Sequence, residues 1–326
     1  MTREALLEIL WQRADAYISG EELAKRLAVS RTAVWKAVGQ LRRDGYRIES
    51  VPNRGYRLLS DSDLLSEEGI RRHLRHQELQ LQVYRTITST NTVLKTLAAQ
   101  NAPAGLALVA GEQTAGRGRL GRSFYSPADS GLYLSLLLRP HMSAVQATHL
   151  TACAAVAAAE TIEALSGRPA QIKWVNDILV DGRKVCGILT EASIDCESGM
   201  MQYVIIGLGV NTHVPKGDFP EELRGIAGAA FGTERSPELR CRLAAGILDR
   251  LADYAIKPEA PAVFEAYRRR SFVPGRAIQI LAPGRDPVPA EALSLLEDYS
   301  LLVRLPDGST TRLNSGEVSV RAEEQG

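Results

Sequence analysis

The sequence predicts a multidomain α+β protein, because three parts of the chain carry three different patterns. Residues 1–60 have apolar residues at helical spacing followed by a short hairpin, and residues 65–270 mix strands, helices and hairpins. Five short strands separated by turn residues follow in residues 271–326. We therefore expect a helical module at 1–62, a central mixed α/β domain at 65–270 and a small β-barrel at 271–326, and not a doubly wound parallel sheet.

The charge of the chain is unevenly distributed. Over 326 residues the net charge is +1, and hydrophobic and charged contents of 45% and 24% are ordinary for a globular protein. Residues 1–60 carry eleven Lys and Arg against seven Asp and Glu, which gives this module a net charge of +4 and leaves −3 for the rest. Positive charge concentrated in the first module indicates a surface that faces DNA.

We expect a cytoplasmic protein that does not enter a membrane. The first ten residues include Arg3, Glu4 and Glu8 and lack the apolar core of a signal peptide, while the longest apolar stretch, 152–159, is too short to span a bilayer. The cysteines form no C-x-x-C pair, so we expect reduced thiols. These cysteines are Cys153, Cys186, Cys196 and Cys241.

The first module has the pattern of three short helices and a two-stranded wing. Ser19 and Ser30 are the predicted N-caps of the second and third helices. The third helix is apolar on one face and polar or basic on the other, as in a helix-turn-helix, and the hairpin at 46–59 adds a wing. A protein-binding winged helix is the alternative, but the basic outer face and the basic wing tip favour DNA. The predicted DNA-binding residues are Arg31, Thr32, Lys36, Gln40 and Arg54.

The large domain is predicted to alternate strands and helices. Asp181-Gly182 is a strong hairpin signal between two of the strands. The strand at 203–210 is expected at an edge of the sheet. The expected strands are 81–87, 107–113, 131–139, 172–174, 178–180, 184–193 and 203–211, and the expected helices are 89–100, 149–165, 239–254 and 260–269.

The most informative segment is Gly116–Arg122, with the sequence GRGRLGR. Glycine allows the backbone to approach a ligand closely, and arginine offers a fixed fork of donors to phosphate or carboxylate. The segment matches G-x-G-x-x-G, but residues 123–127 do not begin a helix, so we reject a dinucleotide-binding fingerprint. A solvated turn is the alternative, yet no turn requires three arginines at this spacing. The segment therefore predicts a loop that holds a polyanionic small molecule.

Four further motifs are individually weak. Residues 173–177, KWVND, place a cation, an indole, an amide and a carboxylate at a strand end, where Lys173 is suited to phosphate and Asp177 to Mg²⁺. Lys184 enters an apolar strand and taken alone is an edge charge. The segment 89–91, Ser-Thr-Asn, is either an N-cap or a ligand-binding cluster. Two glycines near the end of the strand at 203–211 leave room for a ligand close to the backbone.

Together and in this order, these motifs resemble the biotin–protein ligase family. With the N-terminal winged helix, the chain is similar to those members that combine the ligase with a biotin-operon repressor. The resemblance covers nearly the whole chain, including residues 316–319 in the C-terminal barrel, which it implies is SH3-like. Two departures stand out, because the family usually has Trp where Phe124 stands and Pro where Val175 stands. Phenylalanine can still stack, with a smaller face.

The resemblance implies a biotin–[acetyl-CoA-carboxylase] ligase. ATP-Mg and biotin would give biotinyl-5′-adenylate, which would biotinylate a lysine of the biotin carboxyl carrier protein. The adenylate would also be the corepressor that promotes a homodimer on operator DNA. The alternatives are a biotin-sensing repressor without catalysis, which Lys184 and the intact arginine loop argue against, and a lipoate-type ligase, which the GRGRLGR segment argues against.

The resemblance also implies roles for individual residues. Lys184, Arg119 and Arg117 would be catalytic, because cations stabilise the charge that develops at phosphorus. Asp177 would accompany the Mg²⁺ that ATP brings. The residues implied to bind biotin are Ser89, Thr90, Asn91, Gln113, Arg117, Gly118, Arg119 and Lys184. Those implied to bind ATP or the adenylate are Arg122, Phe124, Lys173, Asn176, Asp177 and Asn211.

Overall fold

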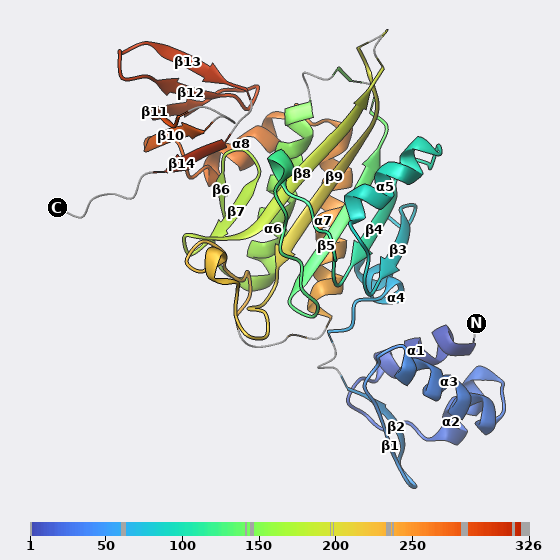
Figure 1. The fold of residues 1–326 in the computed structure, drawn as a ribbon. Helices are drawn as coiled ribbons and strands as arrows, with labels where there is room; N and C mark the ends of the chain where they lie inside the picture. The colour runs from blue at the N-terminus through green and yellow to red at the C-terminus, as the bar shows by residue number, and fades with distance from the viewer. Residues whose placement is uncertain are drawn as a thin grey trace. The chain divides into compact units, whose positions relative to one another are not determined.

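The chain folds into two compact units in the computed structural model (Figure 1). The first unit comprises Met1–His73 with Glu234–Arg242, and the second comprises Leu74–Thr233 with Leu243–Gly326. No helix within the described part of the chain is long and apolar enough to cross a membrane. The structure describes residues 2–59, 63–140, 142–143, 147–195, 197, 199–232, 236, 238–281, 286–314 and 317–320.

The first unit has the predicted three helices and hairpin. The Ser19 hydroxyl accepts a hydrogen bond from the backbone N–H of Glu22, and Ser30 caps the third helix through Ala33, both at 3.1 Å, so the two predicted N-caps are confirmed. Leucine side chains from all three helices form one buried core together with Val34. The elements are α1 (Thr2–Gln12), α2 (Gly20–Leu27), α3 (Arg31–Arg43), β1 (Ile48–Val51), β2 (Gly55–Leu58) and α4 (Glu67–His73).

A buried ion pair joins the segment after the wing to the start of α7 (Leu239–Ile256). The Asp63 carboxylate accepts hydrogen bonds from the backbone N–H and from Nε of Arg240, each at 2.9 Å. The Arg240 guanidinium also donates to the Asp63 carbonyl oxygen at 2.6 Å. The side chains are 3% and 7% exposed. Because both charges are removed from water, loss of either side chain would leave the other as an uncompensated buried charge and destabilise the protein.

The second unit is built on a seven-stranded mixed sheet, as predicted. Among the described strands of this sheet, β3 and β4 pair in parallel and the other neighbouring pairs are antiparallel. The spatial order is β3-β4-β5-β9-β8-β7-β6. The strands are β3 (Gln80–Tyr84), β4 (Leu106–Ala110), β5 (Gly131–Leu138), β6 (Gln171–Lys173), β7 (Asp177–Val180), β8 (Arg183–Ile194) and β9 (Met201–Asn211).

The edge position expected for residues 203–210 is wrong. These residues belong to β9, which lies in the interior of the sheet between β5 and β8. Nearly all of β9 is buried, including the apolar run Val204–Ile206. A continuous apolar strand of this kind needs neighbours on both sides and cover on both faces. The sheet instead ends at β3 and β6.

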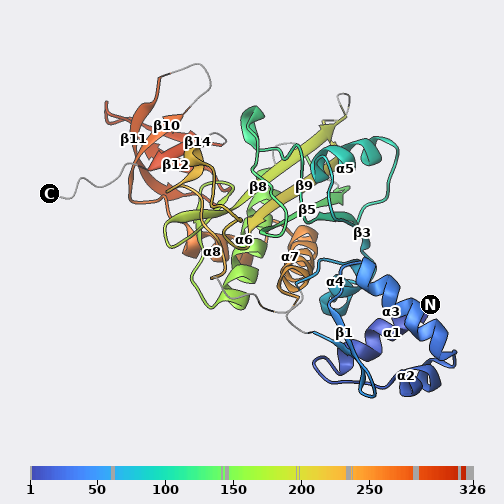
Figure 2. The same cartoon turned by 60° about the horizontal axis from the view of Figure 1, so that its bottom comes forward.

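Helices cover both faces of the sheet (Figures 1 and 2). Helix α5 (Thr90–Ala99) packs on β4, β5 and β9, and the alanine-rich α6 (Ala147–Ser166) packs on the opposite face and against α8 (Pro261–Arg270). The predicted hairpin at 181–182 joins β7 to β8 with φ of 49° and 72°, which is why aspartate and glycine stand there. Short 3₁₀ turns occur at Arg119–Gly121 and Glu221–Leu223.

The C-terminal strands form one antiparallel sheet in the order β13-β12-β11-β10-β14. Among the described residues no pairing of β13 with β14 closes this sheet. The turn before β12 anchors it, because the Tyr299 ring packs edge-on against three aromatic rings and its carbonyl accepts the Trp174 indole N–H at 2.8 Å. The strands are β10 (Ala277–Leu281), β11 (Val288–Leu295), β12 (Leu301–Arg304), β13 (Thr310–Leu313) and β14 (Glu317–Val320).

Three of the four cysteines lie in the described residues, and all three are free and buried. Burial raises the pKa of Cys153 and of Cys241 to about 12. The pKa of Cys186 is also raised, by burial first and then by the Asp177 charge. A buried thiol with a raised pKa is a poor nucleophile, which fits core side chains. Cys196 lies outside the described residues.

Candidate active site

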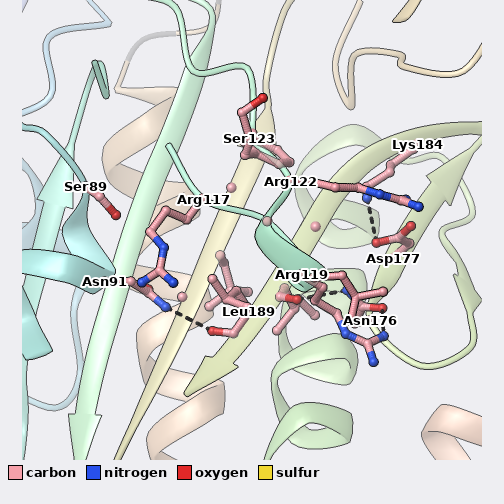
Figure 3. A pocket seen from close by; sticks show the side chains of 18 of the residues that line it. Ser89, Asn91, Arg117, Arg119, Arg122, Ser123, Asn176, Asp177, Lys184 and Leu189 are labelled. Carbon is pink, nitrogen blue, oxygen red and sulfur yellow. Dashed lines mark hydrogen bonds and ion pairs between the residues drawn. The ribbon is translucent and has the colours of Figure 1, made fainter. Parts of the chain in front are cut away.

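A cavity of about 130 Å³ lies in the second unit between the arginine loop, the start of α5 and the strands β7, β8 and β9. Figure 3 shows its side chains. In that view Asn91 and Arg117 lie on one side of the cavity, and Lys184 and Asp177 lie on the other. Val318 of β14 also lines it. Segments far apart in the sequence thus meet in one place.

One end of the cavity is a network of hydroxyl and amide groups. The buried Ser135 hydroxyl lies 2.7 Å from the Thr90 hydroxyl and 2.6 Å from the Asn91 amide oxygen. The Gln113 amide oxygen accepts the backbone N–H of Thr90 at 2.8 Å. Ser89 caps α5 by accepting the N–H of Thr92 at 3.4 Å, so its N-cap role is confirmed. Hydrogen bonds within the protein hold these groups in place, which suits the recognition of a polar head group.

The floor of the cavity consists of glycines. A Cβ at Gly207 would lie 1.9 Å from the Asn91 amide oxygen, and a Cβ at Gly209 would lie 2.4 Å from the Phe124 ring. Gly187, opposite Gly209 across the β8–β9 pair, would place a Cβ 3.1 Å from the same ring. The phenyl ring therefore lies directly on the backbone, and the two strands keep the glycines because no other residue fits beneath it.

Each of three cations at the cavity has a partner within the protein. Arg117 donates to the Glu191 carboxylate at 3.0 Å, and Arg119 donates to the Asn176 amide oxygen at 2.9 Å. Lys184 forms an ion pair with Asp177 at 2.7 Å. Arg117 and Lys184 remain partly exposed, and their partners hold them in position. A ligand phosphate or carboxylate would exchange these partners for its own oxygens.

The structure brings together almost all the residues that the sequence predicted for binding biotin and ATP. All eight predicted biotin-binding residues line the cavity, as do Arg122, Phe124, Lys173, Asn176 and Asp177. Asn211 is not among the described residues that line it and instead pairs with Gly131 at the end of β9. The individual roles of these residues remain predictions.

Two polar residues of this site were missed. Glu191 holds Arg117 and also accepts a hydrogen bond from the Asn91 amide at 3.0 Å, and Ser135 holds Thr90 and Asn91. The one signal for Ser135 is its hydroxyl within the apolar run GLYLSLLL. Nothing near Glu191 in the sequence marks it, because its partner is 74 residues away.

The site is better suited to a metal that arrives with a ligand than to a resident one. Within the described residues no group of three or more His, Cys, Asp or Glu side chains could hold a metal ion. The Asp177 carboxylate and the Asn176 amide oxygen are hard donors of the kind that Mg²⁺ accepts beside phosphate oxygens. They fit the Mg²⁺ of ATP-Mg, with the phosphates supplying the remaining ligands.

The first unit presents a basic face on α3. Arg31, Thr32, Lys36 and Gln40 are exposed there, as predicted. Arg54 at the wing does not extend freely, because its guanidinium lies 4.3 Å from the centre of the Tyr17 ring. This cation–π contact fixes the direction in which the wing arginine points.

Comparison with known proteins finds a family whose match includes most of the residues that line this cavity. The biotin/lipoate A/B protein ligase family matches residues 83–211, and an HTH domain matches residues 2–57. The bifunctional ligase/repressor BirA of Bacillus spizizenii is 43% identical over 227 residues, which is 69% of each chain. The chain belongs to the biotin/lipoate A/B protein ligase family.

Two further members of this family extend the comparison. The biotin–[acetyl-CoA-carboxylase] ligase of Mycobacterium tuberculosis is 30% identical over 274 residues, which cover 80% of this chain and 98% of the relative. The biotin protein ligase of Aquifex aeolicus in complex with biotin and ATP has a TM-score of 0.61 at 28% identity, over 74% of this chain and 98% of the other. The family match includes the arginine loop and the strands β4, β5, β7, β8 and β9.

Proposed function

We propose that this chain is a bifunctional biotin–protein ligase and biotin-responsive repressor. It activates biotin with ATP, transfers it to a lysine of the biotin carboxyl carrier protein of acetyl-CoA carboxylase, and represses biotin genes with biotinyl-5′-adenylate as corepressor. The observation that carries this proposal is the convergence of Arg117, Arg119, Arg122 and Lys184 on one glycine-floored cavity in a chain that also has a winged helix.

The first step joins biotin to AMP. A carboxylate is a poor acyl donor, so a biotin carboxylate oxygen attacks the α-phosphorus of ATP-Mg, and the bond from that phosphorus to pyrophosphate breaks. Negative charge grows on the α-phosphoryl oxygens as the new bond forms. Lys184 and Arg119 line the cavity, and preorganised positive charge there would stabilise this transition state. Asn176 and Asp177 would hold the nucleotide and its Mg²⁺.

The second step moves biotin to protein. The lysine amine of the carrier protein attacks the acyl carbon of the mixed anhydride, AMP leaves, and the amine loses a proton. Water would destroy the same anhydride. Arg117 in the arginine loop, beside Asn91 and Glu191, is placed to close over biotin and exclude water. Ser89, Thr90, Asn91 and Gln113 border biotin and hydrogen-bond its ureido group or its valerate chain.

The regulatory half uses the winged helix. One such module contacts few phosphates, so a tight site needs two copies on a palindrome. We therefore propose that the adenylate-bound chain is a homodimer, because a ligand strengthens DNA binding only if it binds the dimer better than the monomer. The buried, high-pKa thiols of Cys153 and Cys241 fit a cytoplasmic protein.

The C-terminal strands support the small SH3-like barrel expected at 271–326. Five short antiparallel strands follow one another there, and Val318 reaches the cavity. The domain bounds 1–62, 65–270 and 271–326 stay our prediction.

A direct experiment tests the enzyme. The full chain is incubated with biotin, ATP and Mg²⁺, and pyrophosphate release is measured, followed by biotin transfer to a biotin carboxyl carrier domain. A carrier whose acceptor lysine is changed to arginine is the control for transfer. Release of pyrophosphate with biotin but not with lipoate is the expected result. Binding of biotin without pyrophosphate release would instead favour a repressor without catalysis, and activity with lipoate would favour a lipoate-type ligase.

A further inference from the structure

A tryptophan on the outer face of α3 has no place in the core. Trp35 is 65% exposed, whereas Val34, Val38 and Leu41 of the same helix are 0–1% exposed. A single exposed apolar side chain is ordinary on a protein surface. An indole is the largest apolar side chain, however, and this one stands beside Lys36 on the helix of the first unit that carries the basic face.

A glycine leaves the surface next to this tryptophan open. Gly39 lies one helical turn after Trp35, so the two positions are neighbours on the helix surface. A Cβ at Gly39 would meet no other atom within 4 Å, and its φ is helical, so neither packing nor backbone conformation requires glycine there. Glycine is nevertheless among the least favourable residues in a helix interior. Its use in α3 fits a surface that another molecule approaches closely.

The charge of the helix indicates what that molecule is. Residues 31–43 contain four basic side chains and no acidic one. Within the part of the chain that the structure describes, no ion pair joins Arg31, Lys36 or Arg43 to a carboxylate. Thr32, Lys36 and Arg43 follow at intervals of four and seven residues on the side opposite the buried Val34 and Leu41. A face that is this basic complements the phosphates of a duplex.

We propose that Trp35 is a base-reading residue, whose indole packs on a thymine C5-methyl group in the major groove while Gly39 lets the helix enter closely. Apolar contact with that methyl group is a known means of reading an A·T pair, because no other base presents it there. Lys36 and Arg31 then position the helix through phosphates, and Trp35 contributes sequence preference. This inference rests on the proposed repressor function, which supplies the DNA.

The test removes the thymine methyl group and the indole separately and together. The probe is a duplex that the full chain selects from a random-sequence pool in the presence of biotin, ATP and Mg²⁺. Each thymine is replaced in turn by deoxyuridine, which lacks only the methyl group. For the wild-type protein we expect one position in each half-site to weaken binding about fourfold, the value for one buried carbon. Trp35→Ala should weaken binding about tenfold and abolish that deoxyuridine effect.

Two variants separate base reading from other roles. Trp35→Phe keeps an apolar ring and should keep the deoxyuridine effect. Lys36→Ala should weaken binding to every duplex but leave the same thymine sensitive to the loss of its methyl group. If Trp35→Ala binds as tightly as the wild type, or still responds to deoxyuridine at that thymine, the inference is overturned while the repressor function stands. If the wild-type chain selects no duplex at all, the repressor function fails with it.

A graded change at Gly39 tests the close approach. A Cβ at Gly39 would meet no other atom within 4 Å, and both Gly39→Ala and Gly39→Leu replace a poor helix former. Their thermal unfolding temperatures should equal or exceed that of the wild type. DNA affinity should fall from glycine to alanine to leucine, with the leucine variant at least tenfold weaker. Full affinity of the leucine variant would show that the helix does not approach DNA through this face.

Discussion

The two units both present clustered positive charge, but they hold it differently. In the ligase cavity each of Arg117, Arg119 and Lys184 has an internal partner at 2.7–3.0 Å. On α3, Arg31 and Lys36 are exposed and form no ion pair within the described residues. A small ligand binds best to cations that already point toward one site. Hydrogen bonds and ion pairs within the protein hold the three cations in that orientation. A duplex offers many phosphates, and exposed cations that displace the counterions condensed on the DNA are sufficient for binding.

The largest effect should come from removing a positioned cation. Lys184→Ala leaves Asp177 without its partner and removes positive charge from the reacting phosphorus. We expect biotin-dependent pyrophosphate release to fall by on the order of 10²–10³ with the fold intact. The exposed Lys257→Ala, which lies away from the cavity lining, is the control. Wild-type rates in the Lys184 variant would remove this lysine from catalysis.

The next effect concerns the end of the cavity that we propose binds biotin, around Asn91. Gly207→Ala would place a Cβ 1.9 Å from the Asn91 amide oxygen, so Asn91 must move. A displacement of this size should lower kcat/KM for biotin on the order of 10- to 100-fold. Because the residues proposed to bind ATP are untouched, the KM for ATP should change far less. Gly232→Ala, where a Cβ meets nothing within 4 Å, is the matched control, and equal kinetics in both variants would argue against a pre-formed biotin site.

A smaller effect is expected on the DNA side. Lys36→Ala should weaken DNA binding a few-fold and reduce the slope of log affinity against log salt by about 0.9, the value for one lost phosphate contact. Lys257→Ala serves again as the control and should change neither quantity. A salt slope that stays the same in the Lys36 variant would mean that Lys36 touches no phosphate.

The smallest effect is on stability and depends on pH. His76 lies between Asp253 at 2.8 Å and Glu78 at 2.6 Å, and hydrogen bonds to these carboxylates, to Asp253 above all, raise its pKa. A raised histidine pKa adds stability that is complete below the ordinary value near 6.5 and is lost as pH rises through the folded pKa. His76→Gln should therefore lower the free energy of unfolding by under about 1 kcal/mol at pH 6 and by less at pH 9.

Urea unfolding of the wild type and the His76 variant at both pH values measures this difference. His149 titrates in the opposite sense, since burial lowers its pKa, but it is common to both proteins and cancels in the comparison. A variant whose destabilisation grows with pH would contradict the assigned role of the carboxylates.

Local signals predicted the fold well because their causes are local. The caps at Ser19 and Ser30 and the turn at 181–182 depend on a few neighbouring residues, and all are present. The edge position expected for β9 failed because strand order depends on partners distant in sequence. Residues 204–210 alone do not reveal that β5 and β8 lie on both sides.

The residues of the site also differ in how well the sequence predicted them. The order of the motifs predicted the residues that meet at the cavity, but Glu191 and Ser135 act only through Arg117, Asn91 and Thr90 once the chain is folded. Trp35 was absent from the predicted DNA contacts because a tryptophan among valines and leucines carries no signal of exposure. Its position became informative only when its neighbours were found to be buried.

The ion pair of Asp63 and Arg240 affects where a truncated ligase that lacks the winged helix should begin. A shortened protein that starts at residue 62 keeps the Asp63 carboxylate against the Arg240 guanidinium. One that starts at Leu64 leaves the Arg240 guanidinium, which is 7% exposed in the full chain, with neither the carboxylate nor the carbonyl it binds; where the guanidinium stays buried, this loss costs about 3–5 kcal/mol. Two truncations that differ by two residues, both lacking the DNA-binding module, should thus differ widely in solubility and yield. Inactivity of the shorter one would reflect its unfolding and say nothing about whether the ligase needs the winged helix.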